Sequence, residues 1–168
     1  MTVTIWYTEI DSPVGPMRLA TDGAALRRIE FLAGHAERQA PADWIRDAAP
    51  LRTVVEQLRA YFAGALRDFD APLAPQGTTF QQSVWRSLRE IPYGETISYS
   101  ELATRVGNPM AFRAVGLANG QNPIPIVIPC HRVIGKDGTL VGYGGGLHIK
   151  EKLLALERGQ RGLVLSTA

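Results

Sequence analysis

Residues 98–120 read SYSELATRVGNPMAFRAVGLANG, and this stretch decides the fold of the second half of the chain. Ser98 stands three residues before Glu101, a capping-box pattern that begins a helix, and Gly107 is the residue that ends it. Asn108-Pro109 is a start signal for a second helix, which we expect to continue to the end of the stretch. Two short helices joined by a glycine-containing turn are typical of a helix-turn-helix, although ordinary packed helix pairs show the same pattern.

The second of these helices carries small side chains around one arginine, Arg113. The small residues are Ala111, Ala114, Gly116 and Ala118. Such a surface would let the backbone approach a nucleic acid groove while the guanidinium reaches inward. Close packing against a neighbouring helix explains the small residues equally well.

Upstream of this stretch, the sequence indicates another helix and a linker. Residues 79–82 form a capping box that opens an amphipathic helix, and residues 92–94, Pro-Tyr-Gly, end it. Residues 71–77 read APLAPQG and cannot continue a helix. We therefore expect a domain boundary here, with one domain at residues 1–75 and another at residues 76–168.

The N-terminal domain has the pattern of strands followed by a helix. Turn residues at 12–16 and 22–23 separate the extended segments, and residues 33–50 are expected to be a loop with at most a short helix around Trp44. Apolar residues in 51–62 recur at helical spacing. We expect antiparallel strands around residues 3–7, 17–19 and 26–32, and an amphipathic helix over residues 51–64.

Composition and charge exclude several classes of protein. The chain has 168 residues, of which 45% are apolar and 20% charged, and it contains neither a signal-peptide pattern nor an apolar run of membrane-spanning length. We expect a cytoplasmic protein, associated with the nucleoid if it is bacterial. Residues 1–75 hold 8 Arg against 10 acidic residues, net −2, and residues 76–168 hold 10 basic against 6 acidic residues, net +4. The basic second half suits a polyanionic partner, although chance explains a difference of this size equally well.

The only cysteine of the chain, Cys130, lies in an unusual setting. A single cysteine excludes an intrachain disulfide and a multi-cysteine metal site, so we expect no metal. Residues 122–133 read NPIPIVIPCHRV, in which three prolines frame an apolar extended run that ends at Cys130. His131 and Arg132 would favour the thiolate. On these residues alone, Cys130 is either a nucleophile or a buried structural cysteine.

The C-terminal part adds a glycine-rich loop and a closing helix. Residues 142–146 read GYGGG, which could press its backbone N–H groups against a ligand or serve as a flexible turn. The helix expected over residues 147–158 carries Lys150 and Glu157 seven residues apart, hence on one face. The default expectation for both charges is exposure to solvent.

Taken together, these motifs resemble the O6-alkylguanine-DNA alkyltransferase family. The resemblance covers residues 78–157 and rests on the runs PCHRVI at 129–134, RAVG at 113–116 and IPYG at 91–94, with Ser98-Tyr99. Asn122-Pro123 and the glycine-rich loop also match, whereas the first domain matches only in its layout and in YFAG at 61–64. The resemblance implies an α/β + α fold: a small RNase-H-like antiparallel sheet domain followed by a winged-helix-like domain with a helix-turn-helix.

The resemblance implies a self-alkylating DNA repair activity. The chain would transfer an alkyl group from O6-alkylguanine, and also from O4-alkylthymine, in double-stranded DNA to its own Cys130, irreversibly and once per molecule. His131 would take the thiol proton through a water molecule, and Glu157 would orient His131. The remaining catalytic positions implied are Asn122 as a brace, Tyr99 as a donor to guanine N3, and Lys150 as a supporting charge.

The resemblance also implies how DNA is held. Arg113 would fill the stack after the base is flipped out through the minor groove. The other base-binding or DNA-binding positions implied are Ala114, Gly116, Tyr143, Gly144, Val133 and Ser98.

Three features depart from some relatives. Gly144 stands where some of them have serine, and the first domain has no cysteine for their structural zinc site. We expect no additional N-terminal domain with a second acceptor cysteine. No cofactor is implied, and we expect a monomer that can assemble cooperatively on DNA.

Two other functions remain as alternatives. A lesion-binding module of the same fold would bind alkylated DNA without transfer, but such relatives carry another residue in place of Cys130. A cysteine hydrolase using Cys130 and His131 would turn over, whereas self-alkylation stops after one event per chain.

Overall fold

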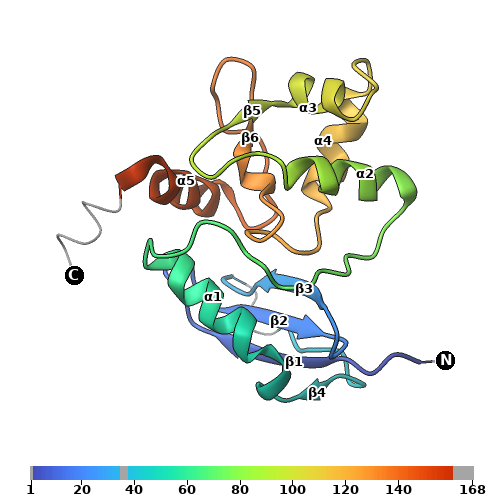
Figure 1. Cartoon of the computed structure of the whole chain (residues 1–168), viewed down its shortest axis with the longest axis vertical. Helices are drawn as coiled ribbons and strands as arrows, with labels where there is room; N and C mark the ends of the chain where they lie inside the picture. The colour runs from blue at the N-terminus through green and yellow to red at the C-terminus, as the bar shows by residue number, and fades with distance from the viewer. Residues whose placement is uncertain (1, 35–37, 161–168) are drawn as a thin grey trace. The chain divides into compact units, whose positions relative to one another are not determined.

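The structure is a computed structural model that describes residues 2–34 and 38–160. Its chain divides into two compact units, Met1–Gln76 and Gly77–Ala168 (Figure 1). The first unit contains a sheet with one main helix, and the second is mainly helical. This is the two-part α/β plus helical fold that the motifs predicted.

Unit 1 is built on a four-stranded sheet with the order β3-β2-β1-β4. The three predicted strands form an antiparallel meander, but β4 pairs parallel to β1, so the sheet is mixed rather than purely antiparallel. The loop expected over residues 33–50, with at most a short helix around Trp44, instead contains β4, because Ile45 donates its N–H to the carbonyl of Ile5 at 2.8 Å and extends the sheet edge. The strands are β1 (Trp6–Ile10), β2 (Met17–Thr21), β3 (Leu26–Phe31) and β4 (Ile45–Arg46).

One face of this sheet is covered by α1 (Arg52–Phe62), which follows a 3-10 turn at Ala49–Leu51 (Figure 1). Met17 and Leu19 of β2 are fully buried, as are Leu58 and Tyr61 of α1. Each fully buried leucine contributes about 1.5–3 kcal/mol relative to exposure. The predicted amphipathic helix is confirmed, and its apolar stripe forms the core of the unit.

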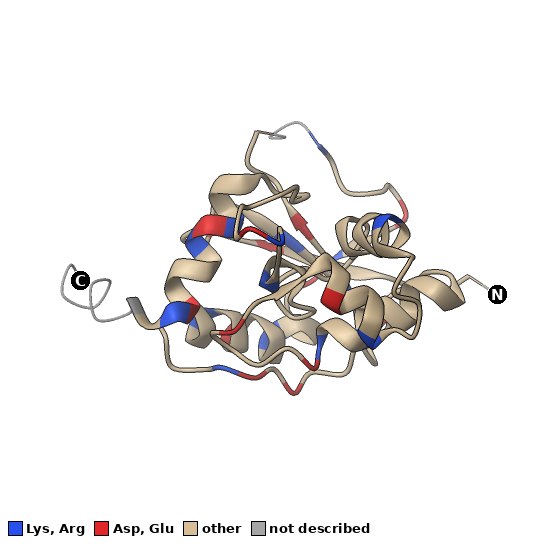
Figure 2. Ribbon diagram, turned by 90° about the horizontal axis from the view of Figure 1, so that it is seen from above, with Lys and Arg blue, Asp and Glu red and all other residues tan. Residues whose placement is uncertain are grey.

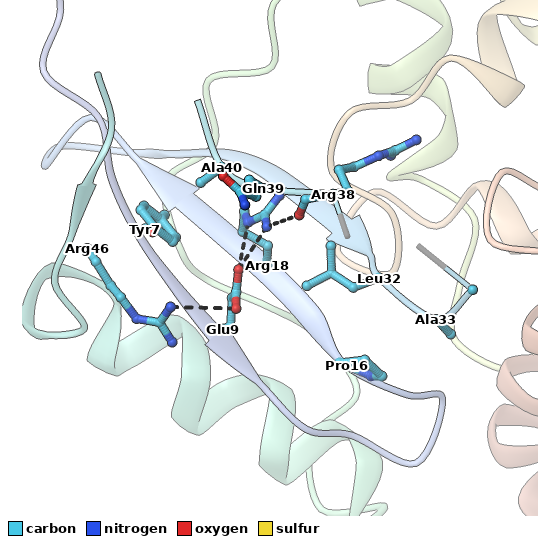
Figure 3. A pocket seen from close by; sticks show the side chains of 11 residues that line it. Tyr7, Glu9, Pro16, Arg18, Leu32, Ala33, Arg38, Gln39, Ala40 and Arg46 are labelled. Atoms are coloured by element: carbon cyan, nitrogen blue, oxygen red, sulfur yellow. Dashed lines mark hydrogen bonds and ion pairs between the residues drawn. The ribbon is translucent and has the colours of Figure 1, made fainter. Parts of the chain in front are cut away.

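The other face of the sheet holds a buried charge that the sequence pattern did not reveal. Register places Glu9, Arg18 and Glu30 side by side on three adjacent strands. Arg18 is 3% exposed, and it ion-pairs with Glu9 at 2.8 Å and Glu30 at 3.0 Å. It also donates to the backbone carbonyl of Arg38 at 2.6 Å beside a cavity of about 580 Å³ (Figure 3). The carboxylates and carbonyl satisfy this guanidinium, which makes the cluster structural.

Unit 2 begins with α2 (Thr79–Leu88), whose cap differs by one residue from the expected one. The capping box is formed by Thr78 and Gln81, because the hydroxyl of Thr78 reaches the N–H three residues later. The helix-turn-helix consists of α3 (Tyr99–Arg105) and α4 (Phe112–Gly120), and both helices pack against α2.

The second helix of the pair starts later than predicted. Asn108 does not cap it, since its carbonyl accepts the N–H of Ala111 at 3.0 Å in a separate turn. The small residue Ala118 is buried against α2, where its carbonyl accepts the indole N–H of Trp85 at 2.9 Å. Close packing explains this position, while Arg113 and Ala114 are exposed.

A short parallel pair of strands, β5 (Ile97–Ser98) and β6 (Val133–Ile134), lies beside the helices. The closing helix α5 (Leu147–Ala155) continues into a wider π-type turn at Leu156–Gln160, where Gly159 has a positive φ of 87°. The predicted single helix over 147–158 therefore changes its winding in the last turn. Glu157 lies in that turn.

Figure 2 shows the basic and acidic residues distributed over many elements of the ribbon. Across the described ranges, no helix is both long and apolar enough to cross a membrane. Within the same ranges, no group of three or more His, Cys, Asp or Glu side chains could hold a metal ion.

Candidate active site

The proline-framed run forms a tight loop that delivers Cys130 to the start of a 3-10 turn, Cys130–Arg132. The side chain of Asn122 closes this loop, because it accepts the N–H of Ile124 at 2.9 Å and donates to the carbonyl of Ile128 at 2.7 Å. Between them, Ile126 has a φ of 74°, a region that β-branched residues rarely occupy. Such a conformation costs on the order of 1–3 kcal/mol and persists only where its surroundings enforce it.

Cys130 is buried and protonated at rest. Its side chain is free of any disulfide, and the residue is 5% exposed. Burial raises the pKa of the thiol above its ordinary value, while the Asn122 amide, the Lys150 ammonium and the Tyr143 hydroxyl partly offset this by favouring the thiolate. A nucleophilic role for this thiol therefore needs a base nearby.

His131 and Glu157 form a buried pair behind the cysteine. The Nε2 atom of His131 lies 2.6 Å from a carboxylate oxygen of Glu157, and both side chains are at most 1% exposed. Burial lowers the pKa of His131, so the imidazole is neutral. Because an ionised carboxylate only accepts, Nε2 must carry the proton and Nδ1 the lone pair. Nδ1 is buried and has no hydrogen-bond partner among the described residues.

Arg132 completes this cluster; the sequence predicted only that it would favour the thiolate, whereas its guanidinium is bonded to Glu157. Its Nε and Nη2 atoms donate to the two oxygens of Glu157 at 2.7 and 3.2 Å, and Nη1 donates to the carbonyl of Ile91 at 2.6 Å. The guanidinium lies 5.7 Å from the centroid of the Tyr93 ring. The N–H of Gly94 points at Glu157 from 3.5 Å. The turn IPYG thus holds the Arg132–Glu157 pair, a contact that spans 25 residues and needs the tertiary fold.

The carboxylate of Glu157 remains ionised in this setting. Burial alone would raise its pKa, but the hydrogen bond from His131 and the hydrogen bonds and charge of Arg132 outweigh it and lower the pKa to about 2. Because Arg132 is always charged, Glu157 stays ionised even though His131 is neutral. The site therefore contains a fixed anion behind a neutral imidazole.

A cavity of about 360 Å³ adjoins the turn that carries Cys130, although Cys130 itself is not among the residues that line it. Asn119 connects the two, because it lines the cavity and its side-chain N–H donates to the carbonyl of Cys130 at 3.4 Å. The lining comes from α3, α4 and the glycine-rich loop: Tyr99, Phe112, Arg113, Gly116, Asn119, Gly120, Val141, Gly142 and Tyr143. Of the predicted residues, Tyr99, Arg113, Gly116 and Tyr143 meet here. Asn119 was not predicted.

Two predicted residues anchor the glycine-rich loop. The ammonium of Lys150 donates to the carbonyls of Val141 at 3.1 Å and Gly142 at 3.4 Å, and the hydroxyl of Tyr99 donates to Val141 at 2.9 Å. Lys150 is fully buried, and burial lowers its pKa. The expectation that Lys150 and Glu157 face solvent is therefore wrong, since the helix turns both inward.

The remaining predicted positions lie around this centre. Ser98 caps α3 by accepting the N–H of Glu101 at 3.1 Å, and Val133 is fully buried in β6. Gly144 leaves room for a side chain, since an added Cβ would lie 3.9 Å from the nearest atom outside its neighbours, the carbonyl oxygen of Gly120. Serine at this position would fit, and the glycine is not required by crowding.

Comparison with known proteins identifies the family. Residues 79–159 match the family model "6-O-methylguanine DNA methyltransferase, DNA binding domain", and residues 5–75 match its "ribonuclease-like domain". The chain belongs to the 6-O-methylguanine DNA methyltransferase family. The two matched regions together cover most of the chain, and the whole cavity and the His131–Glu157 pair fall within the DNA-binding match.

Members of the family from an archaeon and a bacterium are similar over nearly their whole length. A methylated-DNA–protein-cysteine methyltransferase of Methanosarcina barkeri is 55% identical over 153 residues, which cover 91% of this chain and 97% of the relative. The protein of the same name from Mycobacterium tuberculosis is 51% identical over 156 residues, covering 93% and 94%. The crystal structure of Mycobacterium tuberculosis OGT in complex with DNA matches with a TM-score of 0.86 at 51% identity, covering 92% of this chain and 94% of that one.

The buried cluster predicts loss of stability in acid. The pKa of Glu157 is depressed from 4.5 to about 2, so its stabilising contribution is present above pH 4.5 and is lost as the pH falls towards 2. The expected loss is on the order of 3 kcal/mol. His131 acts in the same direction, because the unfolded imidazole takes up a proton below about pH 6.5 and the buried one resists it. Urea denaturation from pH 7 to pH 3 measures the part of this loss, about 2 kcal/mol, that falls above pH 3.

A Glu157→Gln variant is the control for this pH dependence. It should show a flatter dependence below pH 4.5, because its side chain cannot titrate. Equal slopes for the two proteins would show that Glu157 is not the group responsible.

Proposed function

We propose that this chain repairs DNA by transferring an alkyl group from O6 of guanine, and from O4 of thymine, to Sγ of Cys130, once per molecule. The observation that carries the proposal is that the sole cysteine adjoins a buried His131–Glu157 pair inside the region that matches the DNA-binding family model. The reaction class is that of the family to which the chain belongs. DNA supplies the alkyl group, so the reaction requires no cofactor.

The proton relay starts from the resting state of the cluster. Glu157 holds the Nε2 proton of His131, so Nδ1 is the free base, and it receives the thiol proton of Cys130 through a water molecule. The thiolate then attacks the alkyl carbon: the S–C bond forms as the C–O6 bond breaks, and the electron pair leaves on the base. Glu157 stabilises the imidazolium that results, as the carboxylate does in other His-based relays.

The base leaves as an anion, so it must be stabilised by hydrogen-bond donors or a positive charge. The Tyr99 hydroxyl would exchange its bond with Val141 for one to guanine N3, and Lys150 would stabilise the thiolate and the departing anion. Backbone N–H groups near Gly144 would face O6. Asn122 would keep Cys130 in place through the two hydrogen bonds that close its loop.

DNA would be held by the exposed side of α4 in the minor groove. Arg113 is exposed at the mouth of the cavity, where it would fill the stack left by a base flipped into the pocket. Ala114 and Gly116 allow close approach of the helix, and Tyr143 walls the pocket. Ser98 and Val133 would contribute by positioning α3 and the 3-10 turn.

The remaining expectations concern the protein in the cell. We propose that the chain acts as a monomer that can assemble cooperatively on DNA, and that it is cytoplasmic, bound to the nucleoid if its source is a bacterium. Sedimentation of the free chain and of its complex with a long duplex tests both the monomer and the assembly.

Stoichiometry separates this function from its alternatives. With an excess of duplex carrying O6-methylguanine, repair should rise to one lesion per chain and stop. A cysteine hydrolase would continue past one event, and a lesion-binding module would bind the duplex without removing the methyl group. Either outcome would rule out self-alkylation.

Gly94 offers a test of the carboxylate's position. Its φ is +83°, and a Cβ added there would lie 3.0 Å from the backbone oxygen of Glu157. Gly94→Ala should therefore lower the free energy of unfolding by about 1–3 kcal/mol and slow alkyl transfer, because the carboxylate is displaced. Denaturation and single-turnover rates measure the two effects.

Gly138→Ala is the matched control, since that glycine has a similar φ of +88° with open space around it. It should lose stability through backbone strain alone and keep the transfer rate. Equal transfer rates for the two variants would contradict the proposed role of the turn.

A further inference from the structure

The guanidinium of Arg132 binds both carboxylate oxygens of Glu157. Its Nε atom donates to Oε1 at 2.7 Å and its Nη2 atom to Oε2 at 3.2 Å, while Nε2 of His131 lies 2.6 Å from Oε2. The bond from Nη1 to the carbonyl of Ile91 anchors the guanidinium on its other side. Arg132 is 6% exposed, and the other two side chains are at most 1% exposed. The cluster therefore holds one fixed positive charge, one fixed negative charge and a neutral imidazole, all away from solvent.

The charges that face His131 come from three residues. Glu157 favours the protonated imidazole, whereas the positive charges of Arg132 and Lys150 disfavour it. The turn that holds His131 packs against α2 and α5. The other charged or titratable side chains of these helices and of the last turn are exposed to solvent: Arg86, His148, Glu151, Lys152 and Arg158. Of the two positive charges, only that of Arg132 is bonded to the carboxylate.

Without the guanidinium, the buried pair of His131 and Glu157 would hold an uncompensated anion. Such a pair takes up a proton from water more readily. If the proton goes to His131, the imidazolium carries hydrogens on both ring nitrogens. If it goes to Glu157, the carboxyl group becomes the donor to Nε2, and the neutral imidazole then carries its hydrogen on Nδ1. In both arrangements Nδ1 can no longer accept a proton from the thiol.

We propose that Arg132 is a positioning residue of the transfer reaction: its charge and its hydrogen bonds to Glu157 keep Nδ1 of His131 free to receive the thiol proton at neutral pH. The inference rests on the proposed function, because the relay that it concerns is the one that starts at Cys130. It gives Arg132 a part in the reaction beyond its part in stability. A folded chain without this charge has a blocked base at neutral pH and regains the base in alkaline solution, where the additional proton leaves.

The first test follows the imidazole of His131 by NMR as the pH is changed, in the absence of DNA. The chain has three histidines, and the spectrum of His131→Gln assigns the signal of interest. In the native chain, His131 should titrate below its ordinary pKa of 6.5, because burial disfavours the imidazolium. In Arg132→Met it should titrate at a higher pH than in the native chain, and an unchanged or lower titration overturns the inference. If Arg132→Met does not fold, Arg132→Gln takes its place, since its amide can still donate to Glu157 but carries no charge.

The second test compares the pH dependence of single-turnover transfer from a duplex that carries O6-methylguanine. Arg132→Met should react about 10-fold more slowly than the native chain at pH 7 and should recover most of this loss at pH 9. Arg132→Lys should keep more of the rate at pH 7, because its ammonium retains the charge. A loss that is equal at every pH would show a purely structural role and would overturn the inference.

Arg158→Met is the matched control, because it removes a positive charge from the exposed neighbour of Glu157. It should keep the titration of His131 and the pH dependence of the native chain. The same shift in Arg158→Met as in Arg132→Met would assign the effect to net charge and overturn the inference. A native chain that accepts no methyl group at any pH would instead contradict the proposed function, and the titration of His131 would still decide whether Arg132 controls its protonation.

Discussion

Glu157→Ala is expected to abolish alkyl transfer and to lower the free energy of unfolding by about 3–5 kcal/mol. The substitution leaves the guanidinium of Arg132, which is 6% exposed, without its carboxylate, and it removes the partner of the fully buried His131. His131 would no longer be held with its lone pair on Nδ1, so the thiol would lose its base. Urea denaturation and single-turnover alkylation measure the two consequences.

Glu151→Ala is the matched control, since this carboxylate lies exposed on α5. Its stability should change by no more than about 0.5 kcal/mol and its transfer rate should be unaffected. A Glu157→Ala protein as stable as Glu151→Ala would show that the buried cluster contributes nothing to the fold. Retained transfer would show that His131 does not need the carboxylate.

Arg113→Ala should slow repair of duplex DNA by about 30- to 100-fold while leaving the reaction with a free O6-alkylguanine base nearly unchanged. Extruding a base costs a few kcal/mol, and the side chain that fills the stack offsets this cost only in a duplex. Arg113 is exposed, lines the cavity and is not a member of the hydrogen-bonded His131–Arg132–Glu157 cluster. Its replacement should therefore leave the chemistry at Cys130 intact.

Arg89→Ala controls for the loss of one positive charge, because Arg89 is an exposed residue at the end of α2. It should weaken binding only slightly. An equal loss on duplex and free base after Arg113→Ala would place the residue in the chemical step and contradict the flipping role.

Local patterns predicted the elements of this fold better than their ends. The helix pair, the helix over residues 52–62 and the three-stranded meander follow from caps, turns and periodicity, which act within a few residues. The cap of α2 lies at Thr78, one residue before the predicted cap, and α4 begins later than predicted. Both helix ends depend on which of two neighbouring groups forms the hydrogen bond. β4 is a two-residue strand defined by its pairing with β1, so no local sequence pattern predicts it.

The site also has residues that the sequence indicated and contacts that only the tertiary structure creates. The motif around Cys130 and the resemblance it supports indicated His131, Glu157 and Tyr99, and the structure places the first two in contact and the third on the cavity. The partners of Glu157 in the IPYG turn, and the exposed fraction of Lys150, depend on contacts between segments far apart in the chain. Asn119 was missed because small neighbours make its helix look like a packing surface.

The central claim is that Cys130 is the acceptor of a transferred alkyl group. Its most direct test is the intact mass of the chain after incubation with an excess of duplex carrying O6-methylguanine, with Cys130→Ala as the control. The account predicts a gain of one methylene, roughly 14 Da, that stops at one per chain and is absent from the control. No gain by the native chain, or an equal gain by Cys130→Ala, would contradict it.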